Sequence, residues 1–142
     1  MEKMKISWKP VAISLCLMAV AAGLIYAWYV NRPLKVDRGH SEMYSDEEID
    51  RAVEAVKADF ASLGGGKLLS LTYAGDERSK SELAYCNELR KTGEPYTECI
   101  VLDSEFRPPA RGVVWEDGLY RWNWILARSG DGPWIVVTKG YG

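Results

Sequence analysis

Histidine is nearly absent from this chain of 142 residues, and the one histidine, His40, lies outside the segments whose patterns predict helices or strands. A serine–histidine–aspartate or cysteine–histidine arrangement needs an imidazole as its general base. Such an arrangement is therefore excluded within the folded domain, and so is a zinc site with histidine ligands.

Cysteine is also scarce, with Cys16 in an apolar run and Cys86 and Cys99 further along the chain. Two thiolates are too few for a structural zinc site. No glycine-rich loop joins a strand to the start of a helix, because "GGG" at 64–66 follows a predicted helix. We therefore expect no metal and no cofactor.

Positive charge shows no excess, since 18 lysines and arginines stand against 20 acidic residues and the net charge is -2. Nucleic-acid binding calls for a clustered basic surface, so nucleic acid is not an expected partner. The acidic run Asp46, Glu47, Glu48 and Asp50 is typical of a first helical turn, where the helix dipole favours acids, rather than of a metal site.

One long uncharged run is present, "VAISLCLMAVAAGLIYAWYV" at 11–30. As a helix it matches a hydrocarbon core of roughly 30 Å, which predicts a transmembrane anchor after a short cytoplasmic segment, 1–10. A cleaved signal peptide is the alternative, because Ala19-Val20-Ala21 offers a small-residue cleavage site. The anchor is favoured, because cleavage there would leave an apolar stretch exposed at the new terminus.

The orientation of this anchor depends on the charges beside it. The basic residues are balanced across the run, with Lys3, Lys5 and Lys9 before it and Arg32, Lys35 and Arg38 after it. Two features decide the predicted orientation. The amino terminus adds a positive charge before the run, and a basic segment followed by an apolar one is the order found in secretory signals. We expect a single-pass protein of the cell membrane with its domain on the extracytoplasmic side.

The segment 31–44 contains Pro33 and Gly39 and little periodicity, which predicts a linker. Ser45 and Glu48 then form a capping-box pattern. The apolar residues that follow repeat at intervals of four and three, at Ile49, Val53, Val56, Phe60 and Leu63. This spacing predicts a long amphipathic helix that ends at the glycines 64–66.

The remaining patterns alternate between strands and one further helix. Strand periodicity occurs at 67–74, 97–106, 120–128 and 134–140, and a capping-box pattern at Ser79 and Glu82 predicts a shorter helix. The prolines and glycines of 107–118 indicate a loop, in which 112–115 could add an edge strand. The sequence thus predicts one α+β domain, 45–142, with a curved antiparallel sheet on the long helix.

Aromatic residues gather in the last two predicted strands. Strand alternation puts Tyr120, Trp122 and Trp124 on one face, and pairing of Leu126 with Val136 would put Trp134 on the same face. One interpretation is that these side chains form the core under the long helix. The other is that part of this face lines an open ligand pocket.

The stretches "YSDEEID", "IVLDSEF" and "WNWILAR...GPWIVVTKGYG" together resemble an uncharacterised family of small membrane-anchored or secreted proteins of Gram-positive bacteria. The resemblance covers about the last 100 residues, one domain in size. It implies a cone-like α+β fold similar to nuclear-transport-factor-2-like and cystatin-like domains, but no reaction. Members of that family lack the cysteines found here at 86 and 99, so it implies no role for them.

Asp103 and Glu105 alternate along one strand and share a face, which permits a paired-carboxylate enzyme site or a solvated surface. The sequence favours no catalytic residue. The leading hypothesis is a membrane-tethered, non-catalytic module that binds a small-molecule or protein partner outside the membrane, with Tyr120, Trp122, Trp124, Trp134 and Asp103 as candidate ligand-binding residues. The alternatives are a small enzyme that uses Asp103 or Glu105 and a protein-directed inhibitor or immunity-type protein.

The last prediction concerns Cys86 and Cys99. The first is expected on the inner side of the second helix and the second at the start of the next strand, with the turn "GEP" at 93–95 between them. An oxidising exterior would permit a disulfide between them. The alternative is that both are small apolar residues of a core.

Overall fold

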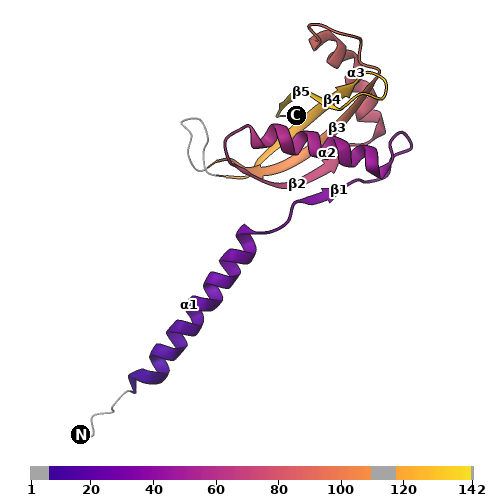
Figure 1. The fold of residues 1–142 in the computed structure, drawn as a ribbon. Coiled ribbons are helices and arrows are strands. Elements are labelled where there is room, and N and C mark those ends of the chain that lie inside the picture. Colours follow the sequence, from indigo (N-terminus) through magenta and orange to yellow (C-terminus); the bar gives the residue numbers. More distant parts are fainter. Residues whose placement is uncertain (1–6, 110–117, 142) are drawn as a thin grey trace, which may run out of the picture. The chain divides into compact units, whose positions relative to one another are not determined.

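The structure is a computed structural model that describes residues 7–109 and 118–141. It divides into two compact units, the first ending at Pro33 and the second beginning at Leu34. Each unit is considered by itself, and Figure 1 gives the order of its elements.

The first unit consists of helix α1, Trp8–Val30. None of its side chains is buried, and it is long and apolar enough to cross a membrane. Just beyond the helix end, the guanidinium of Arg32 lies 4.2 Å from the ring centre of Trp28. The predicted long apolar helix is thus confirmed.

The second unit is built on a five-stranded sheet with the strand order β1-β2-β3-β4-β5. The strands are β1 Lys35–Asp37, β2 Lys67–Tyr73, β3 Glu98–Arg107, β4 Tyr120–Arg128 and β5 Ile135–Gly140. Neighbours from β2 to β5 pair antiparallel, whereas β1 runs parallel to β2. The α+β class is confirmed, but the sheet is mixed rather than purely antiparallel.

Strand β1 lies within the segment 31–44 that the sequence indicates as a linker. Val36 lies opposite Leu71 of β2, and its side chain packs against the main core. The salt bridge between Arg38 and Asp50, 2.7 Å from Nε to Oδ1, joins the following residues to helix α2. The second unit therefore starts before Ser45. The sequence did not indicate this strand, because its partners are distant along the chain.

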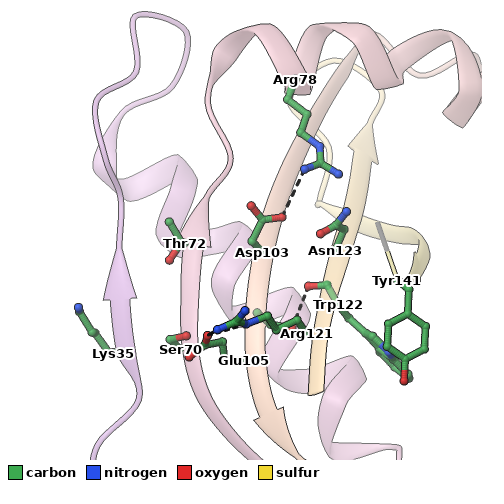
Figure 2. A pocket seen from close by; sticks show the side chains of 11 residues that line it. Lys35, Ser70, Thr72, Arg78, Asp103, Glu105, Arg121, Trp122, Asn123 and Tyr141 are labelled. Atoms are coloured by element: carbon green, nitrogen blue, oxygen red, sulfur yellow. Dashed lines mark hydrogen bonds and ion pairs between the residues drawn. The ribbon is translucent and has the colours of Figure 1, made fainter. Parts of the chain in front are cut away.

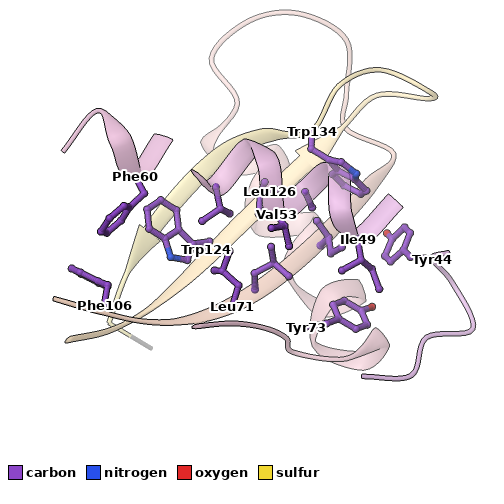
Figure 3. Packing of buried hydrophobic residues seen from close by; sticks show 14 residues of the cluster. Tyr44, Ile49, Val53, Phe60, Leu71, Tyr73, Phe106, Trp124, Leu126 and Trp134 are labelled. Carbon is purple, nitrogen blue, oxygen red and sulfur yellow. The ribbon is translucent and has the colours of Figure 1, made fainter. Parts of the chain in front are cut away.

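Helix α2, Asp46–Ala61, covers one face of the sheet, as Figure 3 shows. The capping box at its start is confirmed, since the Ser45 hydroxyl accepts from the Glu48 amide and the Glu48 carboxylate accepts from the Ser45 amide. The predicted apolar stripe is buried at Ile49, Val53, Val56 and Phe60. These side chains pack on residues of all four longer strands, which form the main core with them.

Helix α3, Asp76–Leu89, packs on β3, β4 and β5. The predicted capping box of Ser79 and Glu82 is wrong, because the helix begins three residues before Ser79, after Gly75. Ser79 is fully buried within the helix, and its hydroxyl accepts a hydrogen bond of 3.1 Å from the Val101 amide of β3. Its hydroxyl therefore docks the helix on the sheet and does not cap it.

The C-terminal hairpin has the predicted register, with Leu126 opposite Val136. Trp134 consequently lies on the same face of the sheet as Trp124, and both belong to the main core. The possible edge strand at 112–115 lies outside the described residues.

Candidate functional site

The two faces of the sheet are covered unequally. Side chains alternate along β3, so Ile100, Leu102 and Phe106 lie in the main core under α2, while Cys99 and Val101 face the other way. Helix α3 covers the end of that second face where Cys99 and Val101 lie, in a smaller apolar cluster with Cys86 and Ala127. Beyond this cluster the same face continues into polar residues.

These polar residues surround a pocket of about 730 Å³, shown in Figure 2. The pocket is lined by Lys35, Ser70, Thr72, Arg78, Asp103, Ser104, Glu105, Arg121, Trp122, Asn123 and Tyr141. They come from β1, β2, β3, β4, helix α3 and the residue that follows β5. A volume of this size lies within the range of about 300–1,000 Å³ found for small-molecule sites.

Asp103 lies at the centre of the pocket and contacts two of its neighbours. Arg78 reaches from the first turns of α3 and places Nη1 3.8 Å from Asp103 Oδ1 (Figure 2). The amide of Asn123 on β4 lies between them. In the amide orientation that satisfies both neighbours, its nitrogen donates to Asp103 Oδ1 at 2.8 Å and its oxygen accepts from Arg78. The three side chains form one polar network across β3, β4 and α3.

A second ion pair lies further along the strands, where Arg121 on β4 is directly opposite Glu105 on β3. The distance from Arg121 Nη2 to Glu105 Oε1 is 2.8 Å. Lys35 of β1 is exposed and forms no ion pair with any residue in the described ranges. Three cations and two carboxylates thus line the pocket, which carries one net positive charge although the whole chain is acidic.

Aromatic side chains form one end of the pocket. Trp122 and Tyr141 lie beside each other there, with ring centres 6.3 Å apart and the planes nearly perpendicular (Figure 2). Tyr141 is well exposed, whereas Trp122 also packs against the main core. A ligand can therefore meet an aromatic edge at one end of the site and charged groups at the other.

Asp76 positions the helix that carries Arg78. Its carboxylate accepts hydrogen bonds from Ser41 Oγ at 2.5 Å, from Tyr73 Oη at 2.7 Å and from the Glu42 amide at 2.9 Å. These hydrogen bonds lower the pKa of Asp76 to about 2, and the one from Ser41 has the largest effect. The start of α3 is thereby fixed to the end of β2 and to the loop before α2.

The structure separates the aromatic residues that the sequence grouped as candidates. Trp124 is fully buried and donates from Nε1 to Ser104 Oγ at 2.8 Å. Trp134 is buried too, and the guanidinium carbon of Arg128 lies 4.4 Å from the centre of its ring. Tyr120 stacks on Phe106 beside the core. Of the five candidates, Trp122 and Asp103 line the pocket.

Nine of the eleven lining residues are absent from that group, among them Lys35, Arg78, Arg121 and Asn123. The sequence contained a signal for Arg121 and Asn123, because they alternate with the aromatic side chains of β4 and so lie on the opposite face. Arg78 gave no such signal, since its position depends on how α3 docks on the sheet. Within the described ranges, no three side chains of the metal-ligating types come together.

No protein-family model, curated protein or solved structure matches this chain.

Proposed function

We propose that this protein is a single-pass, membrane-anchored module that binds a small polar ligand, with an acidic group, in the pocket on the α3 side of its sheet, outside the cytoplasm. The observation that carries the proposal is the pocket itself, which is lined mostly by polar side chains, whereas the other face of the sheet is packed in the main core. The apolar helix α1 supports the membrane anchor. We also propose that the domain has the cone-like architecture named above and that the chain is related to the membrane-anchored or secreted proteins that it resembles.

The charges in the pocket favour an anionic ligand. Arg78 and Arg121 already face carboxylates, but these ion pairs are partly exposed, and exposed pairs contribute only about 0–1 kcal/mol, so a ligand can compete for the guanidinium groups. Lys35 has no competing carboxylate among the described residues, and its neighbour across the strand pair is Ser70. A ligand carboxylate or phosphate at Lys35 would therefore gain a charge-assisted contact without breaking one.

The rest of the lining suits a ligand with several hydroxyl groups. Thr72, Asn123 and Asp103 offer donors and acceptors on one surface, and Trp122 and Tyr141 offer aromatic edges. An acidic sugar combines these features, because it carries a carboxylate, hydroxyl groups and apolar C–H faces. Glucuronate is accordingly a suitable probe.

The proposal predicts that glucuronate binds to the full chain in detergent micelles. In ¹⁵N-resolved NMR titrations, shifts should concentrate on the amides around Thr72, Asp103 and Asn123. Lys35→Met should weaken the apparent affinity by roughly 10- to 150-fold, because a charge-assisted hydrogen bond contributes roughly 1.5–3 kcal/mol. The matched control is Lys57→Met, which removes an exposed lysine paired with Glu54 on α2.

Neutral glucose should shift the same amides less than glucuronate, because it lacks the group that Lys35 recognises. Shifts scattered over the surface, or an affinity that is equal in Lys35→Met and Lys57→Met, would contradict a site in this pocket.

A small enzyme is the second candidate, because Asp103 and Glu105 both line the pocket. Each carboxylate, however, faces an arginine rather than the other carboxylate, so the pair lacks the arrangement of an acid and a base on either side of a bond. Binding is therefore the better-supported function. Turnover of a bound glycoside that is abolished by Asp103→Asn, with binding retained, would reverse this order.

A further inference from the structure

The two cysteines of the domain are in contact beneath helix α3. Cys86 of α3 and Cys99 of β3 are almost fully buried, and their Sγ atoms are 3.7 Å apart. They lie in the smaller apolar cluster, packed with Val101 and Ala127. Among the described residues, no third side chain of a metal-ligating type joins them.

The chain between the cysteines is held so that the two sulfur atoms stay together. The side chain of Asn87 donates to the Tyr96 carbonyl at 3.0 Å and accepts from the Tyr96 amide at 2.9 Å. The Thr97 amide donates to the Arg128 carbonyl at 2.9 Å. These hydrogen bonds close the segment 90–96 beside both cysteines and keep the end of α3 near the start of β3.

We propose that Cys86 and Cys99 form a disulfide in the mature protein. Both thiols are free in this structure. A disulfide bond is about 2.05 Å long, so the sulfurs must approach by roughly 1.7 Å to form it. The inference rests on the proposed extracytoplasmic address, because thiols in the cytosol are kept reduced.

The oxidation is a thiol–disulfide exchange with an external disulfide, either a thiol oxidoreductase or a small-molecule disulfide. The thiolate of one cysteine attacks the oxidant to give a mixed disulfide, and the thiolate of the other then displaces the oxidant. The pair loses two protons and two electrons, and the oxidant leaves as a dithiol or as two thiols. Both thiols are almost fully buried in the folded domain, where an external disulfide cannot reach them, so the exchange belongs to the folding chain, before α3 closes over the pair.

The bond would fix the part of α3 that Asp76 does not reach. Asp76 holds the first turn of the helix, whereas Cys86 lies near its other end. With both parts attached, Arg78 is held over Asp103 at the rim of the pocket. The disulfide is therefore a structural support of the proposed binding site.

Thiol counting on the full-length protein tests the proposal. A Cys16→Ala chain is taken from the membrane fraction of acid-quenched cells, denatured without reductant and treated with a maleimide of high mass. We expect no labelled thiol before reduction and two after it, in a monomer. A further Cys86→Ala substitution serves as the labelling control, because it leaves Cys99 as a single reactive thiol.

Reduction should also lower the melting temperature of the folded Cys16→Ala protein by on the order of 10 °C, and should not change that of the Cys86→Ala control. Two labelled thiols before reduction would overturn the disulfide. If external protease nevertheless digests the domain in spheroplasts, the address stands and the disulfide alone fails. If the domain is protected as well, the failure lies in the address.

Discussion

Asp76 shows how one half-buried carboxylate can organise a site. It receives hydrogen bonds from the loop before α2 and from the end of β2, and it lies in the first turn of α3, where the helix dipole also favours a negative charge. Two residues later, Arg78 reaches the pocket. The position of the pocket rim therefore depends on the charge of this carboxylate.

The lowered pKa of Asp76 predicts a specific dependence of stability on pH. The pKa of Asp76 falls from 3.8 to about 2 on folding. Its contribution to the free energy of unfolding is therefore complete at a pH above the unfolded-state pKa and is lost as the pH falls toward the folded-state pKa. Asp76→Asn should therefore be less stable than the wild type at about pH 6, and the difference should shrink between about pH 4 and pH 2. Urea unfolding of both proteins across this range measures it, and a constant difference would contradict the account.

Helix α2 and strand β1 mark how far local sequence determines an element. The start and the buried face of α2 could be predicted, because the capping box and the apolar spacing lie within the helix itself. The β1 strand could not, since its three residues gain their stability by pairing with β2, more than thirty positions away. Ser79 was misread for a related reason, because its partner, the Val101 amide, is on another element.

The packing of α2 can be tested by two substitutions on opposite faces of the helix. Phe60 is buried and its ring centre lies 5.3 Å from that of Phe106, whereas Glu54 is exposed and pairs with Lys57 on the helix surface. Phe60→Ala should reduce the free energy of unfolding by about 3–5 kcal/mol, and Glu54→Ala by no more than about 0.5 kcal/mol. Equally small losses in chemical denaturation would show that α2 does not form the core as described.

At the scale of the whole molecule, the candidate site was predictable only in part. Alternation along β3 and β4 separates an apolar face from a polar one, and Asp103 was correctly assigned to the polar side of its own strand. Which part of that polar face stays open depends on where α3 packs, and this is a tertiary property. The aromatic residues of the last two strands suggested a site on the other face of the sheet. On that face Trp124 and Trp134 are instead buried in the main core with α2.

The central claim is that α1 anchors a binding domain outside the cytoplasm, and protease accessibility tests it most directly. In intact spheroplasts, external protease should digest the domain, while a cytoplasmic control protein stays intact. The chain should also remain in the membrane pellet after carbonate extraction, because α1 is long and apolar enough to cross the bilayer as we propose. A domain that is protected until the cells are lysed, or a soluble mature protein that begins near Ala22, would contradict the account.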